Sequence, residues 1–347
     1  MADPRDRRAR RLGAPRGQAR PRPDPRAQPG RAGPVTRAFT FLVNPSSGGG
    51  AAAGAVVPVA RVLRDAGASV EVTYSPHPSA MPDLVAEAVG RGDVVVSVGG
   101  DGMLASLAGP VSAEGGTLGL VPAGRGNDFA RMLGLPTLDA DGPEAVARVL
   151  LDGTVRRTDL VGWHGGGAAS GEQRVVAGSV YAGIDARAAA YVHRMHRVPS
   201  RLQYPWGAVR AVATYRPMGL EVVVDGAAHR LTAALVVVAN SGWYGKGMHV
   251  APGAVVDDGL LDVVAVEAAS RSALLRAFPS IYDGSHVERP EVTVLRGKRV
   301  ELRADPAGRE AGVPVGGDGE PLGELPGLGH APAVAEVLPA SLSVLVG

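Results

Sequence analysis

The sequence predicts an α/β domain with an open parallel sheet over residues 38–155, followed by a second domain made mainly of β-strands over residues 156–347. In the first part, valine-rich runs such as "DVVVSV" (93–98) alternate with segments of helical periodicity and show no polar alternation. Such runs are typical of parallel strands that helices cover on both faces. After about residue 155, short strands instead follow one another with turn signals between them.

The first domain contains four predicted strands separated by helices. Glycine ends the first helix, and a glycine-rich turn follows each of three strands. The strands are expected at 38–43, 69–75, 93–98 and 116–124, and helices at 55–67 and 81–92, after the turn at 99–102, and from 128 to 135.

The second domain is predicted to be a β-rich, sandwich-like unit, whose last strand can return toward the first domain. An Asp-Gly pair at 225–226 indicates a hairpin. Strands are expected within 174–184, 219–240, 260–268, 290–304 and 341–347, helices at 201–216 and 270–278, and loops at 162–173 and 307–319.

Composition excludes several classes of protein. The chain has no cysteine, which rules out a disulfide framework and a thiolate metal site. No apolar run approaches the roughly 18 to 20 residues of a membrane span, and the N-terminus lacks the apolar segment of a secretory signal. We therefore expect a cytoplasmic protein.

Residues 1–37 form a basic segment with eleven arginines and three aspartates. It lacks aromatic residues and is rich in proline, so we expect a disordered tail. Two interpretations stay open: attraction to anionic lipid headgroups, or an extension without a function in an arginine-rich protein. Nucleic-acid binding is not favoured, because no aromatic residues are interleaved with the charges.

The stretch "VVVSVGGDGMLASLAG" (94–109) places Asp101 among three glycines directly after a strand. Glycines at this position let backbone N–H groups approach phosphate oxygens. A carboxylate among such donors suits a site where Mg²⁺ mediates, or where a proton must be taken. The alternative is a tight turn in which Asp101 is the N-cap of the following helix.

Two similar turns follow other strands, "NPSSGGG" (44–50) and "PAGRGNDFAR" (122–131). Because the carboxyl ends of parallel strands meet at one edge of a sheet, the three turns are expected to converge there. Together they predict a nucleotide site, although none is a Walker A loop or a G-x-G-x-x-G fingerprint.

These segments resemble the diacylglycerol kinase catalytic domain family, which includes sphingosine, ceramide and bacterial lipid kinases. "NPSSG" (44–48), "GGDGM" (99–103) and "GRGND" (124–128) are similar to its N-P-x-S-G, G-G-D-G-T and G-T-x-N-D motifs. Segments at 204–212, 239–266 and 316–320 follow in family order, and the last two distinguish the chain from NAD kinases and phosphofructokinases. The resemblance covers about residues 38–347.

The resemblance implies an ATP- and Mg²⁺-dependent lipid kinase whose active site lies in a cleft between the two domains. Diacylglycerol is the first acceptor to expect, since it is the commonest in the bacterial branch. Glu320 would be the general base, near Asp101. ATP would be bound by Asn44, Pro45, Ser46, Ser47, Gly48, Gly99, Gly100, Asp101, Gly102, Met103, Arg125, Asn127 and Asp128, and a structural Mg²⁺ by Asp258, the carbonyls of Val255 and Leu260, and Asp257.

Three positions depart from the family pattern. Met103 replaces a threonine, Arg125 replaces a small hydroxyl residue, and Lys246 interrupts a glycine run. These departures concern nucleotide affinity and substrate choice more than the fold.

Other functions stay open at this stage. The acceptor could be a sphingoid base, phosphatidylglycerol or another lipid alcohol; the protein could be an NAD kinase, or a lipid- or nucleotide-binding protein that has lost catalysis. "GGDGE" (316–320) could be a surface hairpin, "DDGLLD" (257–262) a turn that leads into a strand, and His193 with His196 an ordinary polar helix face. We expect peripheral membrane association, a lipid substrate at the membrane surface and no nucleic-acid partner. The oligomeric state stays open, with a homodimer as one alternative.

Overall fold

The computed structural model describes residues 37–44, 51–75, 77–166, 171, 173–193, 200–305 and 312–347. The residues from Thr36 onward form one compact unit. Residues 1–36 of the predicted basic tail, Pro45–Gly48 and His196 lie outside the described residues. The predicted tail boundary is wrong at Arg37, whose guanidinium donates to the carbonyls of Leu150, Leu151 and Gly153 at the end of the first lobe.

The first lobe is the predicted α/β domain, with parallel strands in the order β4-β3-β1-β2. β2 lies on one side of β1, and the chain then crosses over to place β3 on the other side of β1. The sheet therefore has a topological switch point between β1 and β3. Its elements are β1 (Ala38–Val43), α1 (Ala51–Asp65), β2 (Ser69–Tyr74), α2 (Met81–Gly90), β3 (Val94–Gly99), α3 (Asp101–Ala113), β4 (Thr117–Pro122), α4 (Asp128–Met132) and α5 (Leu138–Asp152).

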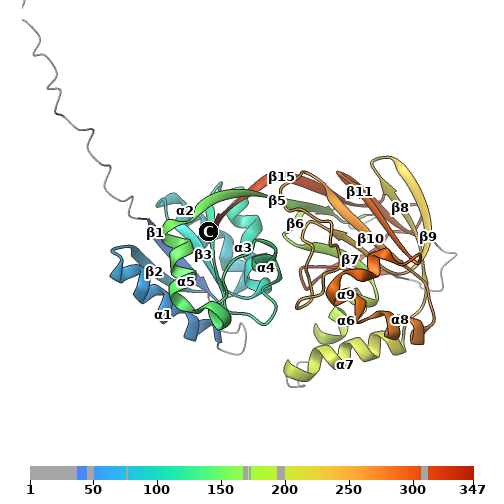
Figure 1. Ribbon diagram of the computed structural model, residues 1–347. Helices are drawn as coiled ribbons and strands as arrows, with labels where there is room; N and C mark the ends of the chain where they lie inside the picture. The colour runs from blue at the N-terminus through green and yellow to red at the C-terminus, as the bar shows by residue number, and fades with distance from the viewer. Residues whose placement is uncertain are drawn as a thin grey trace, which may run out of the picture. The chain divides into compact units, whose positions relative to one another are not determined.

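Helices cover both faces of this sheet, which explains the valine-rich strands (Figure 1). Phe39 and Phe41 of β1 pack toward α1 and α5, whereas Leu42 lies in the core formed with α2 and α3. Alternate residues of one strand therefore enter two different cores. The buried polar side chain of β1, Thr40, donates to Asp93 and accepts a hydrogen bond from Arg91.

The second lobe is mainly antiparallel, as predicted, and includes the expected hairpin at Asp225 and Gly226. Its strands are β5 (Thr154–His164), β6 (Arg174–Val176), β7 (Ser179–Gly183), β8 (Met218–Val224), β9 (Ala227–Ala239), β10 (Leu261–Glu267), β11 (Val292–Gly297), β12 (Arg299–Asp305), β13 (Pro314–Gly317), β14 (Glu320–Glu324) and β15 (Ala333–Val346). Its helices are α6 (Ile184–His193), α7 (Ser200–Ala213), α8 (Arg271–Ala277) and α9 (Ser280–Asp283).

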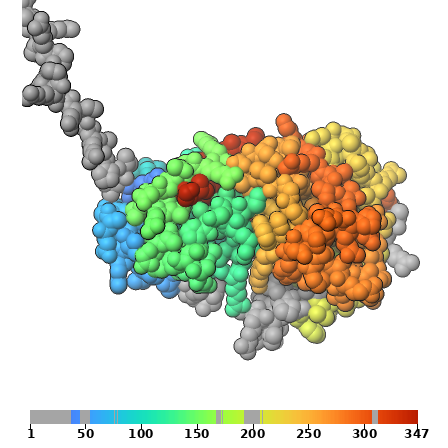
Figure 2. All heavy atoms as spheres, viewed as in Figure 1, coloured from blue at the N-terminus to red at the C-terminus, as the bar shows by residue number. Residues whose placement is uncertain are grey.

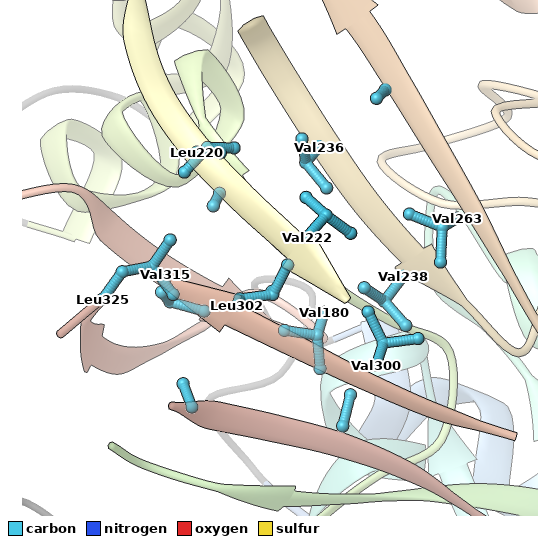
Figure 3. Close-up of a cluster of buried hydrophobic side chains, with 14 of the residues drawn as sticks. Val180, Leu220, Val222, Val236, Val238, Val263, Val300, Leu302, Val315 and Leu325 are labelled. Carbon is cyan, nitrogen blue, oxygen red and sulfur yellow. The ribbon is translucent and has the colours of Figure 1, made fainter. Parts of the chain in front are cut away.

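Valine and leucine side chains from facing strands fill the core of this lobe (Figure 3). Val222 and Leu302 are both less than 2% exposed, and they come from strands that pair side by side, β8 and β12. The long strand β15 joins the lobes: it pairs with β12 and β5, and its end runs parallel to β4. No helix of the described residues is long and apolar enough to cross a bilayer.

Two predicted loops are partly strands, so those predictions are wrong. β5 extends into 162–173, and β13 lies within 307–319. Glycines caused the error, because they stand at strand positions. At Gly316 the Tyr181 ring leaves no room for a side chain, whereas at Gly162 the nearest atom is the flexible end of Gln173. A Cβ on Gly162 would lie 2.4 Å from Gln173 Nε2, and one on Gly316 would lie 2.6 Å from Tyr181 Cε2.

Asp159 of β5 holds three separate segments together. Its carboxylate accepts the N–H groups of Gly259 and Ala340, each at 2.7 Å, while its own N–H donates to Val256 O at 2.6 Å. Asp159 is only 2% exposed. It thus fixes the turn before β10 and the irregular middle of β15 on the same strand.

We expect Asp159→Ala to lower the free energy of unfolding by about 2 kcal/mol or more, because two backbone donors lose a charged acceptor. Urea denaturation measures this, with Asp152→Ala, at an exposed position on α5, as the control. Equal stability of the two variants would contradict the role given to Asp159.

Candidate active site

The turns after β3 and β4 touch through their backbones. A Cβ on Gly124 would lie 2.4 Å from Gly100 Cα, and one on Gly100 would lie 3.1 Å from Gly124 Cα. A side chain at position 124 would clash with the facing backbone, and one at position 100 would be tightly confined. A pocket at this place is lined by Gly99, Gly100, Asp101 and Asn127, together with residues of β4.

Asn127 folds the second turn through its side chain. Its Oδ1 accepts the N–H of Gly124 at 2.9 Å, and its Nδ2 donates to the Gly124 carbonyl at 2.8 Å. Asn127 has a left-handed backbone, φ 52°, which asparagine tolerates better than most residues. The motif therefore needs asparagine to shape the turn.

Asp101 is the first residue of α3, and Gly100 is the N-cap, so the alternative of Asp101 as a simple N-cap is wrong. Its Oδ1 instead accepts the N–H of Phe129 at 3.3 Å, at the start of α4. A Cβ on Gly126 would lie 2.7 Å from Oδ2, so glycine at 126 leaves room for the carboxylate. Burial, then the neighbouring Asp128 charge, raise the pKa of Asp101 to about 6.

Asp128 connects this site to the second lobe. Its Oδ2 accepts the N–H of Lys246 at 2.8 Å, and its Oδ1 accepts the N–H of Gly247 at 2.7 Å. Burial raises the pKa of Asp128, and these two donors oppose the rise. In the space-filling view, green atoms of the first lobe lie directly against orange atoms of the second (Figure 2).

The Asp101 carboxylate is a hard oxygen ligand whose ionised form burial, and then the charge of Asp128, disfavour, so a cation bound beside it would stabilise that form. Mg²⁺ in nucleotide sites commonly takes one or two carboxylates together with phosphate oxygens. Asp101, supported by Asp128, therefore fits a magnesium ion that arrives with a nucleotide.

The turn between β13 and β14 brings a further carboxylate to the site. Asp318 is half-buried, and its charge contributes to the raised pKa of Asp101. Its Oδ2 accepts the N–H of Ala177 at 2.7 Å, and its Oδ1 accepts those of Gly178 and Ser179 at 2.9 and 3.2 Å. Burial raises the pKa of Asp318 against the effect of these donors.

Glu320 stands on the surface at the start of β14, beyond the two-residue turn at Asp318 and Gly319. The segment is thus a hairpin, as the alternative interpretation expected, but an anchored one. The Gly319 N–H also donates to the Tyr181 hydroxyl at 3.1 Å. Sequence reasoning missed Asp318, although it stands within the motif that was singled out for Glu320.

The other expected nucleotide ligands occupy different environments. Asn44 is half-buried at the end of β1, and Gly102 has open space where a side chain would be. Met103 is 2% exposed and packs in the core beneath α3, so its side chain does not face a ligand. Arg125 is exposed on the turn after β4.

The expected structural metal site is engaged in ion pairs. Asp258 Oδ2 lies 2.6 Å from Arg296 Nη2, and Asp257 Oδ2 lies 2.8 Å from Arg156 Nη2. No group of three or more acidic or histidine side chains suited to a metal occurs among the described residues. A cation at Asp258 would compete with Arg296, so the metal site stays a prediction.

We expect Asp101→Asn to stabilise the nucleotide-free protein at neutral pH. A carboxyl group whose pKa rises on folding destabilises the folded state when it ionises, so the penalty grows as the pH rises from about 4 to 6 and then stays constant. The difference in unfolding free energy between Asp101→Asn and the wild type should be about 1 kcal/mol larger at pH 7.5 than at pH 5. Urea unfolding at both values checks this, and a gain independent of pH would contradict it.

The structural Mg²⁺ predicted at Asp258 should raise the melting temperature of the wild-type protein, and Asp258→Ala should abolish that response. Thermal melts with Mg²⁺ or EDTA test this. If wild-type melting does not respond to Mg²⁺ while Arg296→Gln lowers it, the ion pair alone stabilises the turn and the metal site is wrong.

Comparisons with known proteins agree with this geometry. Residues 38–163 match the diacylglycerol kinase catalytic domain, and residues 178–346 match the YegS C-terminal NAD kinase beta sandwich-like domain. A diacylglycerol kinase of Bacillus subtilis is 24% identical over 68% of this chain and 73% of that protein. The crystal structure of a diacylglycerol kinase from Bacillus anthracis has a TM-score of 0.61 at 17% identity, over 90% of this chain and 97% of the other, and shares the fold.

A diacylglycerol kinase of Mycobacterium tuberculosis is 32% identical over 318 residues, which are 88% of this chain and 94% of that protein. Identity at this level over nearly the whole length extends through both lobes. The resemblance found in the sequence motifs is confirmed, and the chain belongs to the diacylglycerol kinase family.

Proposed function

We propose that the protein transfers the γ-phosphate of ATP to a lipid hydroxyl, with diacylglycerol as the first acceptor and phosphatidic acid as the product. The observation that carries this proposal is the pair Asp101 and Asp128, at the point where two glycine turns meet. The names of the relatives support the choice of diacylglycerol.

In this proposal, Asp101 would hold Mg²⁺ together with the nucleotide, and the ion would supply positive charge to neutralise the phosphates. Asp128, whose two oxygens accept the N–H groups of Lys246 and Gly247, would support Asp101 from the adjoining turn. The backbone of Gly99–Gly102 lies against the phosphates, and Asn127 keeps the adjoining turn in shape. The turns after β3 and β4 thus position the nucleotide.

Glu320 is the proposed general base. A base needs an oxygen free to take the proton of the acceptor hydroxyl. Both oxygens of Asp318 already accept backbone N–H groups, whereas Glu320 is exposed two residues later. Asp318 then acts as a positioning residue that fixes the hairpin on which Glu320 stands.

A lipid acceptor requires action at a membrane surface, so we propose a cytoplasmic, peripherally associated enzyme, with the basic tail as a further attraction to anionic lipid. An NAD kinase or a protein that binds ligands without catalysis would behave differently. The decisive assay supplies γ-labelled ATP with mixed lipids or with NAD. Label should enter the organic phase with diacylglycerol; label found only in an aqueous product, or no transfer at all, would contradict the proposal.

Glu320→Gln should lower kcat by about 10²- to 10⁴-fold and leave ATP affinity unchanged, because glutamine keeps the size of the side chain but takes no proton. Asp101→Asn should lower both kcat and Mg²⁺-dependent ATP binding. Steady-state kinetics and calorimetry separate the two effects. If Glu320→Gln keeps more than about a tenth of wild-type turnover, Glu320 is not the general base and another carboxylate takes that role.

A further inference from the structure

The turn at Gly245, Lys246 and Gly247 has a backbone that disfavours lysine. The three residues have φ angles of 61°, 72° and 94°. An L-residue with a side chain is strained in this region, whereas glycine is not. The backbone conformation therefore favours glycine at position 246, and a role of the lysine side chain would explain why a strained residue stands there.

The turn is also held rigidly. Tyr244 and Met248 exchange two backbone hydrogen bonds, each of 3.0 Å. The Tyr244 hydroxyl donates to Asp185 of α6. With its base closed and anchored, the turn presents the Lys246 backbone in one orientation.

Lys246 meets the turn that carries Arg125. Its N–H donates to Asp128, and its Cα lies 3.3 Å from where a Cβ on Gly126 would be. Both Lys246 and Arg125 are exposed. Burial first, and then the charge of Arg125, lower the pKa of Lys246, while Asp128 opposes this. Two of the chain's departures from its family pattern, 121 residues apart in sequence, thus adjoin in space.

The place where they meet borders the glycine turns. Gly124, next to Arg125, touches Gly100, and Gly126 abuts the Asp101 carboxylate. The positive charges of Arg125 and Lys246 repel each other, and a ligand with several negative charges relieves that repulsion. Phosphate groups bind arginine and lysine in this manner.

We propose that Arg125 and Lys246 form a two-cation clamp for the terminal phosphates of the nucleotide. This proposal rests on the proposed function and deepens it. Asp128 positions the clamp, because it holds the Lys246 backbone beside the turn of Arg125. The β- and γ-phosphates are the groups gripped, so a nucleotide without them gains nothing from the clamp.

The test is calorimetric titration of the full chain with MgATP and with AMP. Arg125→Gln and Lys246→Gln should each weaken MgATP binding about tenfold or more, the usual effect of losing a charge-assisted hydrogen bond, and leave AMP binding unchanged. Lys246→Gly should weaken MgATP equally, while its melting temperature stays at or above the wild-type value, since the backbone strain is removed. Arg148→Gln and Lys298→Gln, at exposed positions elsewhere, are the matched controls.

MgATP affinity unchanged in both neutral variants overturns the clamp. So does a loss confined to binding of phosphatidate-containing micelles, which would place a lipid phosphate there instead. If the wild-type protein phosphorylates lipid and the variants bind MgATP as tightly as the wild type, the clamp proposal is wrong while the proposed kinase activity is supported. If the wild-type protein binds no MgATP, the proposed function and the clamp both fail.

Discussion

The Asp128 carboxylate is the interaction on which the candidate site depends. It lies at the start of a five-residue helix in the first lobe, and its two oxygens hold consecutive backbone N–H groups of the second lobe, at 2.8 and 2.7 Å. Without it, the start of α4 would lose its two hydrogen bonds to the turn at 245–247. The strained turn would then lose the acceptor that fixes it beside the glycines.

The same device recurs elsewhere in the fold. Asp159 and Asp318 also accept several backbone N–H groups from segments far away in the chain. A carboxylate can accept several hydrogen bonds at once, so one aspartate can join segments that are far apart in the sequence. Asp318 fixes the hairpin of Glu320, and Asp159 fixes the turn before β10. The aspartates thus determine where the catalytic candidates stand.

Hydrophobic periodicity predicted the strands and most helices of the first lobe, because each buried strand there needs apolar residues on both faces. It failed at Gly162 and Gly316, where glycines stand inside strands. It also missed α5, which Gly142, with a φ of 81°, interrupts with a kink just before Pro143. The motifs located Asp101 and Asn127. They could not identify Asp318 as the anchored carboxylate, because the donors at 177–179 are about 140 residues away and adjoin it only in the folded chain.

The central claim is that the turns after β3 and β4 and the turn at 245–247 form one nucleotide site. Hydrogen exchange of the amides with and without a non-hydrolysable MgATP analogue tests it most directly. The account predicts that segments 99–103, 124–129 and 244–248 gain protection together. Protection of the first two segments without the third would contradict it.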